Sequence, residues 1–202
     1  MMILRSSPAS PFGRKVRIAA SLLGLADKID VRETDLNDPA DSIRKQNPIG
    51  KIPALIADDG ETYYDSRVIL EYLDHLAGGG RIVPREPKAR FAALRMQALC
   101  DGILDASLLL VYESRYRPAE MKVQTWVDRQ ADKVARGLAA LEVAPPALTP
   151  VPDVGQIALA CVLGYRDLRF GGTWRNDHPK LVAWLDKFAA QVPAFAATKV
   201  AA

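Results

Sequence analysis

The pattern of apolar and polar positions changes at about residue 80: strand and helix patterns alternate before it, and only helical patterns follow it. Short apolar runs at Met2–Arg5 and Asp30–Thr34 predict strands, and the segment Pro11–Leu23 between them has a helical period and is closed by Gly24. A strand, a helix and a strand in this order predict a parallel pair of strands joined by a crossover helix.

The predicted helix Pro11–Leu23 is amphipathic. Its apolar residues share one face at helical spacing, and these are Phe12, Val16, Ala19, Ala20 and Leu23. The basic residues Arg14, Lys15 and Arg17 fall on the other face. We therefore expect one buried side and one basic side for this helix.

Two further strands and a helix complete the first half. The segments Ala54–Ala57 and Glu61–Asp65 predict strands, and Asp58-Asp59-Gly60 between them is a hairpin signal. A helix is predicted from Ser66, with a buried side made of Ile69, Tyr72, Leu73 and Leu76. The resulting βαβ–ββα order is the thioredoxin-like plan, an α/β fold.

Glycine and proline separate this half from the rest of the chain, at Gly78-Gly79-Gly80 and again at Pro84–Pro87. Every later segment has a helical pattern. Helices are predicted from about Pro87 to Glu113, after Pro118, after the proline-rich connection Pro145–Pro152, and after His178-Pro179. We expect an α/β domain over residues 1–78, a linker over 79–87 and an all-α helical domain over 88–202.

One helix of the second half is predicted to be buried on every side. The residues Asp153-Val154-Gly155-Gln156 have the pattern of a capping box, and the run Ile157–Leu163 that follows is apolar at every position. An apolar surface all round is typical of a helix at the centre of a core.

Composition narrows the class of protein. Of the 202 residues, 49% are apolar and 25% are charged, which is the balance of a globular protein with a core. No apolar run approaches the roughly eighteen residues that cross a bilayer, and no signal-peptide pattern opens the chain, so no membrane partner is expected. Cys100 and Cys161 lie in apolar helical patterns. They are predicted to be buried thiols in a reducing compartment, and a cytoplasmic location is expected.

Charge and histidine content argue against two other classes. The net charge is +3, but the arginines are scattered rather than gathered in a stripe, so a nucleic-acid partner is not expected. His75 and His178 each stand alone, without partners at ligand spacing, so no metal site is expected.

The first candidate for chemistry is Ser10, which precedes Pro11 at the start of a predicted helix. Proline is favoured at the first helical position, so Ser10 would lie at the N-terminus, where unpaired N–H groups and the helix dipole favour negative charge. A hydroxyl there can donate a hydrogen bond to an anion such as a thiolate. Ser6 and Ser7 are rivals a few residues upstream.

Several segments, by their order and spacing, resemble the N-terminal domain of the soluble glutathione transferases. They are Ser10-Pro11-Phe12, the run Asn47-Pro48-Ile49-Gly50-Lys51-Ile52-Pro53-Ala54-Leu55, and Asp65-Ser66 before a helix. The resemblance covers the whole α/β half, and the second half resembles the family's all-helical domain more loosely. The run Val16-Arg17-Ile18-Ala19 resembles the same segment of the serine-type tau and zeta classes, and this resemblance implies that Ser10 is the catalytic serine. The chain therefore resembles a bacterial member of the family with a serine-type active site.

The resemblance implies that glutathione is the cosubstrate and that Ser10 holds its sulfur as the thiolate. Thiol pKa values lie near 8.5, so a hydroxyl donor and a helix dipole would raise the reactive fraction. Phe12 is implied to belong to the glutathione site. The Ile52-Pro53 bond is implied to be cis, with Ile52 offering its backbone N–H and C=O to the peptide.

The two ends of glutathione would meet other residues. The resemblance implies that Ser66 and its helix N-terminus bind the γ-glutamyl carboxylate and that Asp65 pairs with the ammonium group. Lys51 is implied to reach the carboxylate at the glycyl end, with a solvated surface lysine as the alternative. Two positions depart from the family pattern: Asp65, where Glu is common, and Gln156, where Asp is usual.

An acceptor pocket is implied between the domains. The residues expected to line it are Leu104, Leu108, Tyr112, Arg115, Tyr116 and Trp174. Arg115 and Tyr116 lie near a helix end, where a long polar side chain could orient a charged acceptor. The sequence does not name the electrophile.

The resulting hypothesis is a glutathione S-transferase that conjugates glutathione to a small electrophile, a role in detoxification. A non-catalytic relative that binds a partner protein or a ligand is the second hypothesis, and a glutathione-dependent isomerase or dehalogenase is the third. Serine rather than cysteine at position 10 disfavours glutaredoxin-like or dehydroascorbate reductase chemistry. A symmetric homodimer is also implied, with the first long helix of the second domain at its interface.

Overall fold

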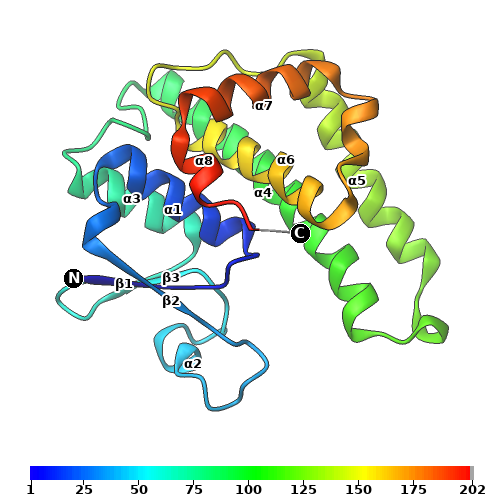
Figure 1. The fold of residues 1–202 in the computed structure, drawn as a ribbon, viewed down its shortest axis with the longest axis horizontal. Helices are drawn as coiled ribbons and strands as arrows, with labels where there is room; N and C mark the ends of the chain where they lie inside the picture. Colours follow the sequence, from blue (N-terminus) through cyan, green and yellow to red (C-terminus); the bar gives the residue numbers. More distant parts are fainter. Residues whose placement is uncertain (201–202) are drawn as a thin grey trace.

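The computed structural model describes residues 1–200 as a sheet covered by helices and joined to a helical domain (Figure 1). The strands are β1 (Met2–Ser6), β2 (Ile29–Glu33), β3 (Ala54–Ile56) and β4 (Thr62–Tyr63), in the sheet order β2-β1-β3-β4. β2 is parallel to β1, whereas β1–β3 and β3–β4 are antiparallel. Helices α1 (Pro11–Leu23) and α3 (Ser66–Leu76) lie on the face toward the helical domain, and the short α2 (Ile43–Gln46) lies on the opposite side.

This arrangement confirms the predicted thioredoxin-like half. The ends of α1 follow from its flanking residues, because Pro11 opens the helix and Gly24 ends it in the left-handed region at φ 72°. Strands β3 and β4 are shorter than predicted, β4 most of all, and α2 is a single helical turn that the sequence pattern does not reveal.

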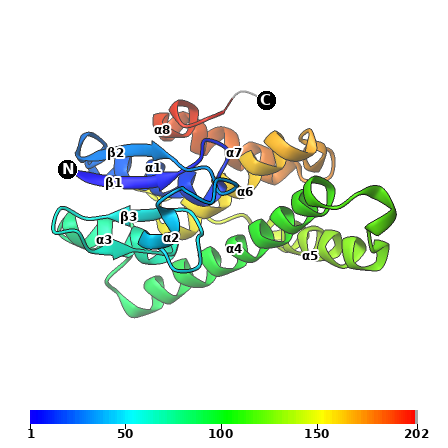
Figure 2. The same ribbon diagram turned by 90° about the horizontal axis from the view of Figure 1, so that it is seen from below.

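The second half is helical throughout, as predicted. Its helices are α4 (Pro87–Tyr116), α5 (Gln124–Val143), α6 (Val154–Phe170), α7 (Pro179–Gln191) and α8 (Pro193–Ala197). Single 3-10 turns cover Ala26–Lys28, Ala119–Met121 and Thr173–Asn176. Figure 2 shows α4 running along the whole molecule, with its far end joined to α5 beyond the edge of the sheet.

Helix α6 is the central helix, and every residue from Val154 to Leu163 is buried. Its predicted capping box is present, since the Asp153 carboxylate accepts from the backbone of Gly155 and Gln156 and the Gln156 side chain accepts from the Asp153 N–H. Gln156 also donates to the Ala147 carbonyl and accepts from Thr149. Its amide therefore ties the proline-rich connection to the start of α6.

Two predictions about buried faces are wrong. Lys15, expected on the basic side of α1, is fully buried with its Nζ 2.5 Å from Asp101 Oδ1 of α4. The reason is that α1 packs against α3 of its own half and also against α6 and α8 of the helical domain, so its second face is covered as well. On α3, Leu76 is 44% exposed and Leu70 takes its place in the core.

The Lys15–Asp101 pair gives a test of how the two halves hold together. Lys15→Met leaves the Asp101 carboxylate buried without its ammonium partner, so we expect a loss of about 3–5 kcal/mol in the free energy of unfolding at pH 7, measured in urea. Burial raises the pKa of Asp101, so the folded variant favours the protonated acid. Its deficit therefore shrinks as the pH falls through this raised folded-state pKa.

Arg17→Met is the matched control, because Arg17 lies on the same helix and has no ion pair within residues 1–200. Its cost should stay within about 1 kcal/mol. The double variant Lys15→Met/Asp101→Leu should recover most of the lost stability, since an apolar pair replaces the buried charges. Equal costs for Lys15→Met and Arg17→Met would contradict the assigned role.

Candidate active site

Ser10 is the N-cap of α1, at the point where the chain leaves β1. Its Oγ accepts a hydrogen bond of 3.1 Å from the Gly13 N–H. A hydroxyl has one proton to donate and two lone pairs, so this bond leaves the Ser10 proton free for another acceptor. Added to the dipole at the N-terminus of α1, this makes Ser10 a suitable donor to an anion.

A cavity of about 530 Å³ lies between the two halves and includes Ser10 on its wall. Its other walls come from the loop Asp35–Asn37, from Lys51 and Ile52, and from one face of α4. Tyr165 and Arg169 of α6 complete it. The Ile52–Pro53 peptide beside the cavity is cis, in agreement with the resemblance.

The cavity brings together most of the residues singled out in the sequence. Those on its wall are Ser10, Phe12, Lys51, Ile52, Leu108, Tyr112, Arg115 and Tyr116. Leu104 and Trp174 are absent from the wall. Leu104 has no exposed surface and faces the helical core, while Trp174 is buried and donates its Nε1–H to Asp167.

Asp65 and Ser66 lie at the start of α3, outside the residues that line this cavity. Asp65, not Ser66, is the N-cap: its carboxylate accepts from the Arg67 N–H, and Ser66 is the first helical residue. The Arg67 guanidinium pairs with Asp65 at 2.8 Å. Burial acts to raise the pKa of Asp65, but the Arg67 hydrogen bonds outweigh it and hold the pKa below its ordinary value.

Arg67 also connects this helix start to the buried pair below it. Its Nε lies 3.8 Å from Asp101 Oδ2, an oxygen that has no hydrogen-bond partner within the described residues. A line of alternating charges therefore runs from Asp65 through Arg67 and Asp101 to Lys15. It links α3, α4 and α1.

Sequence reasoning missed several residues of this region. Asp105, Tyr165 and Arg169 line the cavity, and Arg67 and Asp101 lie beside Asp65 at the start of α3. Helical spacing was the available signal on α4, because Asp101, Asp105, Leu108 and Tyr112 follow at intervals of four, three and four residues. Tyr165 and Arg169 are likewise four residues apart on α6.

Known proteins are similar to this chain in fold and in sequence. The profile of the glutathione S-transferase N-terminal domain matches residues 4–81, and the profile of the C-terminal domain matches residues 124–187. The uncharacterized GST-like protein YibF of Escherichia coli K12 is 34% identical over 186 residues, which is 90% of this chain and 90% of that protein. The chain belongs to the glutathione S-transferase family.

Solved structures of the family agree. A glutathione transferase family member from Pseudomonas fluorescens Pf-5 with bound glutathione is 38% identical, covers both chains completely and has a TM-score of 0.91. That family member has also been solved with bound S-(propanoic acid)-glutathione. A glutathione S-transferase from Methylobacterium radiotolerans, in complex with glutathione sulfonate, is 32% identical over 100% of this chain and 95% of its own, with a TM-score of 0.89.

In this member of the glutathione S-transferase family, both cysteines are buried, as predicted. Burial raises the pKa of the Cys161 thiol to about 12 and that of Cys100 further still, so neither supplies a thiolate at neutral pH. Within residues 1–200 no group of histidine, cysteine and carboxylate side chains could hold a metal ion. None of the described helices is long and apolar enough to cross a membrane.

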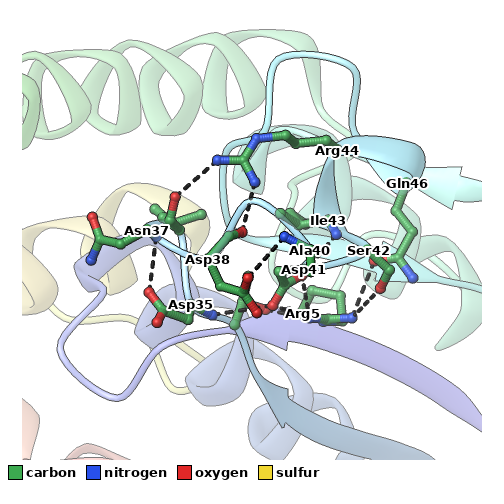
Figure 3. Close-up of polar contacts among 12 residues, drawn as sticks. Arg5, Asp35, Asn37, Asp38, Ala40, Asp41, Ser42, Ile43, Arg44 and Gln46 are labelled. Carbon is green, nitrogen blue, oxygen red and sulfur yellow. Dashed lines mark hydrogen bonds and ion pairs between the residues drawn. The ribbon is translucent and has the colours of Figure 1, made fainter.

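The loop that forms one cavity wall is held by two arginines (Figure 3). Arg5 of β1 is buried and its guanidinium pairs with both oxygens of Asp41, at 2.8 and 2.9 Å. Arg44 of α2 donates to the carbonyls of Leu36 and Asp38, at 3.0 and 2.9 Å. The first arginine fixes the base of the loop and the second fixes the part next to the cavity.

Arg44→Gln should loosen this cavity wall without unfolding the protein, because Arg44 is exposed and makes two hydrogen bonds to the loop. Two bonds of about 1 kcal/mol each predict a rise of roughly tenfold or more in amide exchange over residues 35–40. Hydrogen–deuterium exchange with mass spectrometry measures it. Lys45→Gln changes the exposed neighbour on the same helix and is the control. An equal rise in that variant would show that the Arg44 hydrogen bonds do not hold the loop.

Proposed function

We propose that this protein is a glutathione transferase that binds glutathione in the cavity, holds its sulfur as a thiolate at Ser10 and adds it to a small electrophile. The observation that carries this proposal is the Ser10 hydroxyl on the cavity wall. Its oxygen is already an acceptor from Gly13, so its proton is available to an anion. The side chain stabilises a nucleophile that the cosubstrate brings, and it is not itself the nucleophile.

The loop around the cis peptide supports a place for the centre of glutathione. Within residues 1–200 we find no hydrogen-bond partner for the backbone N–H or C=O of Ile52, and this residue lines the cavity. A tripeptide can add to these two groups as an extra strand would. Lys51 and Phe12 on the same wall are proposed to contact the peptide, with the Lys51 ammonium toward its glycyl carboxylate.

The γ-glutamyl end is proposed to reach the start of α3. Ser66 and the first N–H groups of this helix would bind its carboxylate, and Asp65 would pair with its ammonium group. Arg67 and Lys15 keep Asp65 ionised, because both lower its pKa against the effect of burial. An ionised carboxylate is the form that an ammonium group requires.

Conjugation is the reaction that fits best among the glutathione-dependent activities. The Pseudomonas relative binds a glutathione with a substituent on its sulfur, and by analogy the same position here would hold an acceptor. An isomerase or a dehalogenase would use the same thiolate and differ in its acceptor. A protein that only binds glutathione would need no hydrogen-bond donor such as the Ser10 hydroxyl at the sulfur. The two buried thiols of this protein fit a cytoplasmic location, and conjugation of an electrophile fits a role in detoxification.

Calorimetric titration of glutathione into wild type and Ser10→Ala tests this proposal. We expect wild type to release close to one proton per glutathione at pH 7, seen as a dependence of the heat on the buffer. Loss of a charge-assisted hydrogen bond of about 1.5–3 kcal/mol raises the thiol pKa by roughly one to two units. Ser10→Ala should therefore lose at least about half of the proton release and lower kcat/KM about tenfold to a hundredfold.

Ser7→Ala is the matched control, because Ser7 lies on the same wall and was a rival in the sequence. It should keep the proton release. Loss in Ser7→Ala and not in Ser10→Ala would transfer the role to Ser7. Binding without any proton release would support a binding protein, and no binding at millimolar glutathione would overturn the proposal.

We also propose a symmetric homodimer with α4 at its interface. Phe91 on α4 is 69% exposed and Val68 on α3 is 48% exposed. The ion pair between Arg90 and Glu71, at 2.8 Å, places these two exposed apolar side chains on adjoining turns. An exposed apolar surface on two helices joined by an ion pair is suited to association with a second copy.

Sedimentation at micromolar concentration should give a species of twice the 22.1 kDa chain mass. Phe91→Asp, which brings a charge into the interface core, should weaken the dimer by at least about 30-fold. Met121→Asp is the control, since Met121 is as exposed but lies at the far end of the helical domain. A wild type that sediments as a single chain would refute the dimer.

A further inference from the structure

The end of the cavity formed by α4 and α6 carries two arginines, Arg115 and Arg169. Neither has a carboxylate partner within residues 1–200. The arginines that do pair with carboxylates are others: Arg5, Arg32, Arg67, Arg90, Arg117, Arg136 and Arg175. Two uncompensated positive charges therefore come from different helices to the wall of one cavity.

The acidic residues of the same cavity do not offset these charges. Burial raises the pKa of Asp105, and the cations that oppose this shift are Lys51, Arg67 and Lys15, on the side of the glutathione site. Asp35 belongs to the loop wall and not to α4 or α6, and its Oδ1 accepts from the Asn37 N–H within that loop. The end of the cavity next to α6 is thus positive.

The remaining groups at this end are aliphatic and phenolic. Leu108, Tyr112 and Tyr116 come from α4, and the rings of the two tyrosines lie 5.4 Å apart. Tyr165 of α6 is buried, which raises its pKa, and both Arg169 and Arg115 oppose the shift. Both arginines line the cavity together with this phenol, one from each helix.

We propose that the acceptor is a small electrophile that carries a carboxylate, bound by Arg115 and Arg169 with the phenols of Tyr112 and Tyr165 beside it. This inference rests on the proposed transferase function. A guanidinium binds a carboxylate through two parallel hydrogen bonds, and a protonated phenol can donate one more. With a halocarboxylate, the thiolate electron pair forms the sulfur–carbon bond while the carbon–halogen bond breaks, and the halide leaves with its electron pair.

Glutathione derivatives that differ only in charge test this inference without relying on turnover. S-carboxyalkyl glutathiones with one to four methylenes are titrated calorimetrically into the full-length protein, each beside its primary amide, which has nearly the same shape and no charge. We expect at least one carboxylate of the series to bind about tenfold to a hundredfold tighter than its amide, as hydrogen bonds between charged groups allow.

Variants assign this preference to the two arginines. Arg115→Gln and Arg169→Gln should each reduce it, and the double variant should abolish it while binding of the amides and of glutathione itself changes less than about threefold. Arg129→Gln is the matched control, because Arg129 is exposed and lies outside the cavity, and its substitution removes the same charge. It should keep the full preference.

Iodoacetate and iodoacetamide give the corresponding kinetic test, since they share the reacting carbon and leaving group and differ in charge. Both cysteines of the protein are buried and so protected from alkylation. The double variant should raise KM for iodoacetate and leave iodoacetamide unchanged. Equal binding of every carboxylate and its amide, or a preference that survives in the double variant, overturns this inference alone. Failure of glutathione and all conjugates to bind overturns the proposed function, and the inference with it.

Discussion

Helix α1 is held by both halves of the molecule at once, and the position of Ser10 depends on it. Its residues Val16 and Ile18 are fully buried, and it packs against α3 of its own half and against α6 and α8 of the other. Arg14 donates to the Phe195 carbonyl at 2.6 Å, and Lys15 pairs with Asp101. Helix α1 cannot turn about its axis without breaking this buried ion pair, so the position of its N-terminus at the cavity is fixed.

The junction between the halves is polar as well as apolar, and this restricts how the two halves fit. The charges of Asp65, Arg67, Asp101 and Lys15 alternate in sign from α3 through α4 to α1. A purely apolar junction would tolerate small shifts of one half against the other, whereas the buried charges of Lys15 and Asp101 need each other at hydrogen-bond distance. The same charges link α3 to α1, whose N-termini are proposed to bind the γ-glutamyl end and the thiolate of glutathione.

Many element boundaries in both halves follow from local sequence. Pro11 and Gly24 delimit α1, the Asp58-Asp59-Gly60 turn separates β3 from β4, and Asp153 begins α6. These features are predictable because each depends on the conformation of one or two residues. Short elements such as α2 and α8 escape prediction, since four or five residues contain too little of the helical period to reveal it.

The failures concern helices with more than one buried face. Periodicity assigns a helix one apolar stripe, and it therefore assigned Lys15 to the solvent side. Its partner Asp101 lies 86 residues away in the sequence, so no local pattern indicates the pairing. On the 30-residue α4, Leu104 and Leu108 have the same local pattern, yet the first is in the core and the second is on the cavity wall. Only the rotation of α4 against α6 decides between them, and that rotation is set by packing across the whole helix.

The two ends of the cavity are built from different parts of the chain, and this explains why one end can be identified from motifs and the other cannot. The proposed glutathione end relies on backbone groups, at Ile52 and at two helix N-termini, so it requires particular turns and caps that leave a signature in the sequence. The end beside α6 consists of side chains on helices whose opposite faces form the core. Such side chains can differ between proteins without disturbing the fold, since Arg115 and Arg169 are themselves exposed. The acceptor is therefore to be inferred from the charges and shapes that meet there, and in this chain the unpaired charges are positive.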